Sequence, residues 1–358
     1  MIKYPSIDQF RSVVKAVSFR TNYDGKDEAT GKPKFVPRTQ PTLKFRGTTK
    51  IHGTNASIVI RNIDNAPVVT YQSRERELTL EQDNAGFMLY MSSQMPSIAR
   101  LASHIRYVYE LDITVSPLTI YGEWAGGNIQ KGVAISGLEK FFAIFGIRVG
   151  EGDETRWLDI EKLGNLHENV LLQSPSTRFY NILDFGKWET EINFERPLEI
   201  QNHLGELTLA VEKECPVGKF FGNLGVGEGI VWRCIEKGWE SSDYQFKVKG
   251  DEHSASKVKK LATVDVEAVR AISDFVDMAV TEARLTQGAQ NLVREQGLEF
   301  EMANMGPFIK WVYADVMKEE MDTIVANQLD PKKLGGPLAN KARAWFVTKF
   351  NEGADFSA

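Results

Sequence analysis

The distribution of strand-like segments divides this chain into two parts. Short runs rich in β-branched and aromatic residues recur through the first 250 residues, and no such run follows residue 255. They lie at 41–46, 55–62, 67–72, 117–123, 140–148, 228–233 and 244–249. The pattern predicts an α+β domain at residues 1–255 and a small all-α domain at 262–358, with the boundary between 251 and 262.

Apolar residues at helical spacing predict the helices. One is expected at 7–18, with Ser6 as its N-cap, and another at 95–111. Polar residues with glycine and proline predict a long loop at 21–40, whereas residues 150–220 show no clear pattern. Beyond the boundary, Pro331, Gly335, Gly336 and Pro337 separate the last two of the helices expected at 264–285, 286–297, 307–328 and 335–351.

Composition excludes several classes of protein. The two cysteines, Cys215 and Cys234, form no CxxC pair, so neither a cysteine zinc site nor a disulfide framework is expected. This usage favours a reduced, cytoplasmic setting. No stretch of about 18 apolar residues occurs, so a membrane span is not expected.

The charge is unevenly distributed. The net charge is −5, but residues 1–50 hold eleven Lys or Arg against four Asp or Glu. A second basic run comprises Lys247, Lys249, Lys257, Lys259 and Lys260. Two basic stretches on an acidic protein suggest a phosphate-binding face, although a solvated surface would explain them equally well.

Segment 50–55, with the sequence KIHGTN, concentrates reactive and polar residues after a strand-like run. Lys50 becomes a nucleophile if its pKa falls from about 10.4 toward 7–8, which desolvation or nearby positive charge can cause. Gly53 allows close approach of the backbone. On these residues alone, a surface lysine before a turn is the commoner explanation.

Two further groups of charged residues lie on predicted strands. Lys247 and Lys249 share one strand face, where a triphosphate could lie between them, but lysines also protect edge strands. Glu123 and Glu228 stand at strand ends and could hold a ribose hydroxyl or hydrated Mg²⁺, or simply be solvated turn carboxylates. Phe145, in an apolar strand, could stack on a base or pack in the core.

Taken in order, these motifs resemble the covalent nucleotidyltransferase superfamily of ligases and capping enzymes. The sequence is most similar to the RNA ligase 2 family of phages and trypanosome editing ligases, because His52 replaces the aspartate of DNA ligases and YGEWAGGNIQK occupies 121–131. The resemblance covers roughly residues 40–250 and continues weakly near 306–320. The motifs are KIHGTN, the SR pair ending at Arg74, GEWAG, the strand with Phe145, EGIVWR and KVK.

The resemblance implies a reaction sequence. Lys50 would attack the α-phosphate of ATP and expel pyrophosphate, leaving a lysyl-AMP. The AMP would pass to a 5′-phosphate end, and a 3′-hydroxyl would then displace it. His52 would assist pyrophosphate release, and Lys247 and Lys249 would contact the α-phosphate.

The resemblance also implies binding roles for the other residues. Glu123 would hold the ribose, Phe145 would stack on adenine, and Glu228 would help bind Mg²⁺, for which Mn²⁺ is expected to substitute. Asn55 and Arg74 would act at the nucleotide and at the nucleic-acid ends. Arg233 stands where the family usually has lysine, with a part in phosphate or end binding.

For the whole chain, the resemblance implies an ATP-grasp-like catalytic domain with antiparallel sheets and an all-helical C-terminal module. The expected activity is ATP-dependent RNA ligation in RNA repair, on nicked duplex RNA, an RNA/DNA hybrid or RNA ends. A monomer in the cytoplasm is favoured, in the host cytoplasm if the protein is viral.

The sequence departs from the family pattern in three places. Thr49 replaces a glutamate before the nucleophile, and Gly146 replaces an acidic residue after the stacking aromatic. The basic segment 20–40 is an additional feature. If the missing glutamate contacts adenine, base recognition is looser or rebuilt here.

Two other functions use similar residues. A DNA ligase or an mRNA capping guanylyltransferase would share the lysyl-nucleotide chemistry, but an OB-fold would then be expected after residue 249, where helices are predicted. A non-enzymatic nucleic-acid-binding module would have lost reactive residues. Lys50, Glu123, Glu228, Lys247 and Lys249 are all present.

Overall fold

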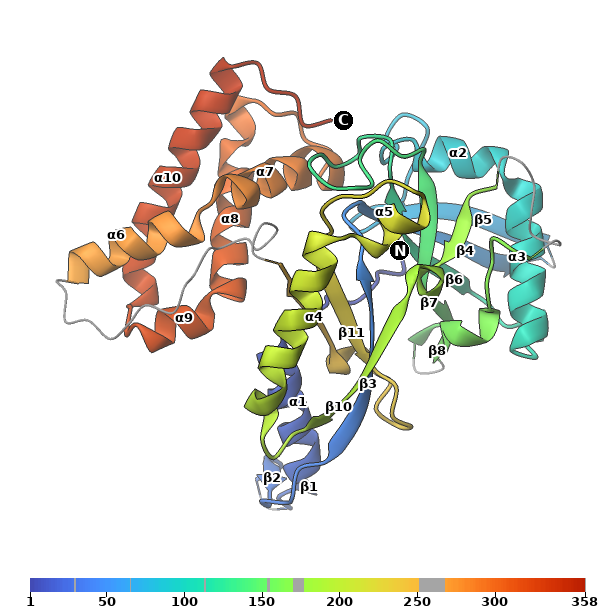
Figure 1. Cartoon of the computed structure of the whole chain (residues 1–358), viewed down its shortest axis with the longest axis horizontal. Coiled ribbons are helices and arrows are strands. Elements are labelled where there is room, and N and C mark those ends of the chain that lie inside the picture. The colour runs from blue at the N-terminus through green and yellow to red at the C-terminus, as the bar shows by residue number, and fades with distance from the viewer. Residues whose placement is uncertain are drawn as a thin grey trace. The chain divides into compact units, whose positions relative to one another are not determined.

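The computed structural model describes residues 1–28, 30–64, 66–112, 114–152, 155–169, 177–250 and 268–357. The chain divides into two compact units, Met1–Gly250 and Asp251–Ala358 (Figure 1). The predicted boundary at 251–262 lies outside the described residues, as do Lys257, Lys259 and Lys260. Among the described helices, none is long and apolar enough to cross a membrane.

Two sheets form the centre of the first unit (Figure 1). The larger has the order β5-β4-β6-β7-β8, and β9 also pairs with β7; every pair is antiparallel except β7 with β9. Its strands are β4 (Thr54–Ile63), β5 (Ala66–Ser73), β6 (Leu118–Ala125), β7 (Phe141–Val149), β8 (Arg156–Leu158) and β9 (Phe179–Asn181).

The smaller sheet is fully antiparallel, with the order β10-β3-β11-β12. Its strands are β3 (Thr42–Lys50), β10 (Lys187–Asn193), β11 (Gly229–Cys234) and β12 (Gln245–Lys249). With the helical second unit, these sheets confirm the predicted α+β class.

Helices cover one face of each sheet. The larger sheet packs on α2 (Phe87–Ser93) and α3 (Met95–Val108), and the smaller on α1 (Phe10–Asn22) and α4 (Gln201–Lys213) (Figure 1). The remaining helical segments of this unit are η2 (Ile160–Leu163), η3 (Ile182–Phe185), η4 (Pro197–Ile200), α5 (Pro216–Phe220) and η5 (Ser242–Tyr244).

Residue alternation along β3 explains how this sheet separates core from site. Successive side chains of a strand point to opposite faces. Leu43 and Phe45 pack with α1 and α4 in one buried cluster. Arg46 and Lys50 have the opposite parity and therefore lie on the other face, where both form ion pairs.

The described part of the second unit, residues 268–357, contains helices and no strand. Its apolar core includes Phe275, Leu285, Phe308, Leu338 and Phe346. The helical segments are α6 (Ala268–Ala279), α7 (Glu282–Gln290), η6 (Asn291–Glu295), η7 (Met302–Asn304), α8 (Met305–Glu319), α9 (Met321–Ala326) and α10 (Pro331–Asn351).

All seven predicted strands and the helix at 95–111 are present. The N-cap prediction was wrong, because α1 begins at Phe10 after Gln9 and not after Ser6. The predicted loop at 21–40 contains two short paired strands, β1 (Tyr23–Lys26) and β2 (Pro33–Phe35).

The helix boundaries in the second unit also differ from the prediction. The segment predicted at 307–328 divides at Glu320 into α8 and α9. Gly335, Gly336 and Pro337 lie inside α10 and do not start it, because Asp330 caps the helix and Pro331 occupies its first turn.

Candidate active site

Three predicted site residues converge on the buried carboxylate of a fourth, Glu228. Lys50, the last residue of β3, donates from Nζ to Glu228 Oε2 at 2.7 Å, and Lys249 Nζ lies 3.2 Å from the other oxygen, Oε1. His52 Nδ1 lies 3.2 Å from Oε2. The Glu228 side chain is only 2% exposed, so its charge depends on these neighbours.

The backbone around β11 and β12 fixes this carboxylate. Gly229 pairs with both Lys50 and Lys249 across the sheet, and Gly250 donates its N–H to the Glu228 carbonyl at 3.0 Å. Gly229 has φ +151°, and a Cβ there would lie 2.2 Å from the Val248 carbonyl oxygen. Only glycine therefore fits beside Glu228.

The pKa of Glu228 reflects two opposing effects. Burial alone would raise it, but the positive charges of Lys50 and Lys249, with His52, outweigh burial and hold the pKa well below the ordinary value of 4.5. Glu228 therefore remains ionised at neutral pH and is a poor proton acceptor.

Glu123 is the second carboxylate of the site. Its Oε1 accepts the Gly53 N–H at 3.1 Å. Burial raises the pKa of Glu123 to about 7, with Glu228 adding to the rise and Lys50 opposing it. A Cβ at Gly53 would lie 2.4 Å from the Trp124 carbonyl oxygen, so this turn needs glycine to reach Glu123.

The other charged and amide residues predicted for the site lie around this centre. Asn55 of β4 pairs directly with Glu123 of β6. Arg74 follows β5, is exposed, and donates to Ser6 Oγ at 3.3 Å. Lys247 has the same parity as Lys249 and therefore the same face of β12.

Phe145 and Arg233 meet a residue that sequence reasoning missed, Tyr4. The Tyr4 ring contacts Phe145 edge-on with centroids 4.9 Å apart. Its hydroxyl accepts from Arg233 Nη2 and donates to Gln245 Oε1, both at 2.8 Å. Arg233 also donates to the Phe145 carbonyl at 3.1 Å. Tyr4 therefore joins β7 of the larger sheet to β11 and β12 of the smaller one.

The N-terminal segment is itself anchored. The Ile2 N–H donates to Gln72 Oε1 at 3.0 Å, and the Tyr121 hydroxyl donates to the Ile2 carbonyl at 3.2 Å. Tyr4 also contacts the rings of Tyr121 and Trp157. In the sequence, the only sign was one aromatic residue in a short segment before the first helix.

The structure accounts for one departure from the family pattern and locates another. A Cβ at Gly146 would approach the Tyr4 ring to 3.2 Å, so glycine leaves room for Tyr4. Thr49 is buried on the face of β3 opposite Lys50, and its hydroxyl has no hydrogen-bond partner within the described residues.

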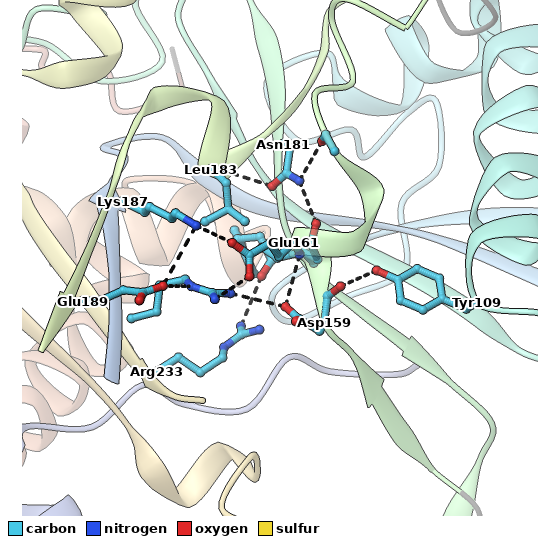
Figure 2. A network of polar contacts seen from close by, with 12 residues as sticks. Tyr109, Asp159, Glu161, Asn181, Leu183, Lys187, Glu189 and Arg233 are labelled. Carbon is cyan, nitrogen blue, oxygen red and sulfur yellow. Dashed lines mark hydrogen bonds and ion pairs between the residues drawn. The ribbon is translucent and has the colours of Figure 1, made fainter. Parts of the chain in front are cut away.

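A second charged group was also missed. Arg46 contacts three carboxylates, Glu161 at 2.5 Å, Glu189 at 3.2 Å and Asp159 at 3.4 Å. Lys187 pairs with Glu161 as well (Figure 2). Since Asp159 and Glu161 follow β8 and the others belong to the smaller sheet, the network joins the two sheets. We call it the Arg46 network.

Candidate metal ligands are few. Within the described ranges, no three His, Cys, Asp or Glu residues form a metal-binding group. Glu228 has both oxygens engaged by cations. A divalent cation could use Glu228 together with ligands from a bound anion, as Mg²⁺ does with one or two carboxylates and substrate phosphates.

Comparison with known proteins identifies one family. The family model described as RNA ligase matches residues 43–249, which is more than half of the chain. No sequence among the curated proteins matches.

Solved structures of Naegleria gruberi RNA ligase are similar to this chain at low identity. A mutant with ATP and Mn has 14% identity and a TM-score of 0.41, and the ligase with PPi has 15% and 0.38. Each comparison covers 70% of this chain and 57% of the ligase, so this chain matches less than two thirds of their length.

Proposed function

Because the chain belongs to the RNA ligase family, we propose that it joins RNA 3′-hydroxyl and 5′-phosphate ends by ATP-dependent ligation through a lysyl-AMP on Lys50. The supporting observation is the meeting of Lys50, His52 and Lys249 at Glu228. Three potentially cationic groups around one carboxylate leave an excess of positive charge, which a polyphosphate would satisfy.

Lys50 is the proposed nucleophile. In the structure its amine donates to Glu228, and only the unprotonated amine can attack. The low pKa of Glu228 makes that carboxylate unsuitable as the base. Its proposed part is to orient the amine and stabilise the neighbouring cations.

Lys249 and Lys247 would bind the α-phosphate and stabilise the charge that develops there. His52, beside Lys50, would assist release of pyrophosphate. Phosphoryl transfer depends mainly on in-line positioning and charge neutralisation, which fixed cations on adjacent strands supply.

Glu123 would accept a ribose hydroxyl, and Phe145 would stack on adenine. Asn55 and Arg74 would act at the nucleotide and the strand ends, and Arg233 would support phosphate or end binding while Tyr4 holds it in place. Because Tyr4 contacts both Phe145 and Arg233, it would position the base-binding side of the site.

ATP and a divalent cation, Mg²⁺ or Mn²⁺, are the proposed cofactors. Glu228 is the residue proposed to bind the metal. When the Lys50 amine is unprotonated, Glu228 Oε2 has less positive charge beside it and can accept a cation. A bound cation would neutralise phosphate charge. We assign catalysis to residues 1–255 and engagement of the nucleic acid to the helical domain at 262–358, in a cytoplasmic monomer.

Incubation with α-labelled ATP and Mg²⁺ tests this chemistry. The wild-type protein should become covalently labelled, and Lys50→Arg should not, because arginine keeps the charge beside Glu228 but is not a nucleophile. Lys44→Arg is the matched control, since Lys44 lies on the same strand and is exposed. A labelled Lys50→Arg protein would refute the proposed intermediate.

The substrate is tested separately. Nicked duplexes with RNA or DNA on each side of the nick should be sealed when both sides are RNA and poorly when both sides are DNA. Equal sealing of all-DNA nicks would favour a DNA ligase, and covalent labelling by GTP in preference to ATP would favour a capping enzyme.

A further inference from the structure

Three aromatic rings form an exposed cluster at the end of α1 and on the β1–β2 hairpin. Phe19, Tyr23 and Phe35 have exposed fractions of 56%, 37% and 46%. Their ring centroids lie 5.0 Å apart for Phe19 and Phe35, and 6.1 Å apart for each of the other two pairs. We call these three residues the aromatic platform.

The backbone that carries the platform is held firmly. Arg38 donates to the Tyr23 carbonyl at 3.0 Å and to Asp24 Oδ1 at 2.5 Å. The Val36 N–H donates to the Asn22 carbonyl at 2.8 Å. Contacts among the rings help to stabilise a two-stranded hairpin, which is marginal alone. Stabilising the hairpin does not by itself explain why all three rings are more than a third exposed. Their exposed faces can therefore contact a ligand.

Charge is arranged beside the rings. Arg11, Lys15 and Phe19 follow one another at four-residue intervals, which places them in a row along one side of α1. The Phe19 ring at the end of this row stacks on Tyr23, the first residue of β1. Asp24 alternates with Tyr23 and therefore lies on the opposite side of β1, where it pairs with Lys34 and Arg38. Residues 10–38 together hold seven Lys or Arg against three Asp or Glu, in a protein of net charge −5.

We propose that the aromatic platform stacks the bases of a single-stranded polynucleotide, while Lys15 and Arg11 meet its phosphates. Exposed aromatic rings next to cations are how proteins bind single strands without reading sequence, because every base has a stacking face. A duplex would hide those faces, so the occupant is an unpaired strand.

The platform lies at a distance from the reacting lysine. β3 runs from Thr42, near the hairpin, to Lys50, and nine extended residues span about 27 Å. A stacked strand that rises about 3.4 Å per nucleotide covers this length in about eight nucleotides. The platform would therefore hold a tail of the substrate beyond the reacting ends. This step rests on the proposed function only in taking a polynucleotide as substrate.

Fluorescence anisotropy with nicked RNA duplexes tests the proposal. The duplexes carry a single-stranded tail of 4 or 16 nucleotides, at either the 5′ or the 3′ end. The longer tail should tighten binding to the wild-type protein, and Phe19→Ser should lose roughly fivefold or more of that gain, as expected for one stacked base. Lys15→Glu should lose part of it and make the remaining binding less salt-dependent.

Two controls separate this proposal from the ligase chemistry. Tyr107→Ser removes an aromatic ring that is 82% exposed on α3 and should leave the gain unchanged. Covalent labelling by ATP should be normal in Phe19→Ser, whose site is intact. The proposal is overturned if the long tail gives no gain, if a double-stranded tail gives the same gain, or if Phe19→Ser binds like the wild type. Failure of Lys50 labelling would instead overturn the proposed function.

Discussion

Two groups of charges lie on the same face of β3 and have opposite compositions. At its end, one carboxylate, Glu228, is shared by Lys50, Lys249 and His52. Four residues earlier, about 13 Å along the strand, Arg46 is surrounded by three carboxylates. The first group has an excess of positive charge, and the second, even with Lys187, has an excess of negative charge.

This difference shows how one strand can serve both stability and chemistry. The Arg46 network satisfies its cations within the protein and ties the two sheets together (Figure 2). The Glu228 group leaves an excess of positive charge that a bound anion would balance. Under the proposed function, the carboxylates around Arg46 would repel a polyphosphate and favour its binding at the Lys50 end of the strand.

The largest expected effect is at the positive group. Glu228→Gln keeps the shape of the side chain but leaves Lys50 and Lys249 without their carboxylate. We expect the rate of enzyme adenylation to fall by roughly 100-fold or more, comparable with losing a group that organises charge in an active site. The rate of label incorporation measures this. A rate within threefold of the wild type would show that Glu228 only fills space.

Loss of Arg46, unlike loss of Glu228, should lower the stability of the protein and leave adenylation largely intact. Arg46→Met removes the cation that three carboxylates share and leaves only Lys187 beside them, and we expect the free energy of unfolding in urea to fall by roughly 2 kcal/mol. The loss stays moderate because these carboxylates are about half exposed and water replaces part of the interaction. Adenylation per folded molecule should persist. If adenylation falls as far as in Glu228→Gln, the two groups do not have separate roles.

The pH dependence of ATP binding sharpens the comparison further. With a pKa of about 7, Glu123 is mostly protonated at pH 6, so the KM for ATP should rise about tenfold from pH 8 to pH 6. Glu123→Gln should abolish this dependence, as initial rates across that range would show. A KM that still rises in Glu123→Gln would assign the titration to another group.

The raised pKa of Glu123 also predicts how the stability of the protein depends on pH. Because the folded state raises this pKa from 4.5, the contribution of Glu123 to stability is present below pH 4.5 and is lost as the pH rises through 7. Wild-type protein should therefore lose stability relative to Glu123→Gln over that interval, and urea denaturation at several pH values measures the difference.

The smallest effect is expected at Tyr4, which belongs to neither charged group. Tyr4→Phe removes only the hydroxyl that contacts Arg233 and Gln245, and we expect the KM for ATP to rise about fivefold with little change in kcat. Tyr109→Phe is the control, because it removes a hydroxyl that donates to the Asp159 carbonyl in the Arg46 network. An equal change in both variants would indicate a general loss of stability.

Local patterns were sufficient for most of the fold. The runs of β-branched and aromatic residues in β4 and β6 predicted those strands, because most residues of both strands are buried. The pattern at 21–40 was misleading, since Tyr23 and Phe35 pair across a hairpin whose rings stay exposed. In α10, the cap at Asp330 outweighed the glycines and proline that follow it.

Residues of the candidate site could be predicted where they belong to one continuous motif. They could not be predicted where their contacts are far apart in the sequence. Lys50 and His52 belong to one short motif, and the order of motifs brought in Glu123 and Glu228. Tyr4 and Arg46 could not be found in this way, because Gln245 is 241 residues from Tyr4 and Glu189 is 143 residues from Arg46. Such pairings depend on how the two sheets face each other, which no local pattern records.

The parity of β3 restricts how this protein can change in length. Leu43 and Phe45 lie on the buried face of β3, and Arg46 and Lys50 lie on the opposite face. Inserting or deleting one residue between Leu43 and Lys50 would turn one of these two sets to the wrong side of the sheet. Removing two residues would keep each set on its own side and only shift its position along the strand. Insertions and deletions before Lys50 should therefore be better tolerated in twos, or when they are confined to the connection that precedes Thr42.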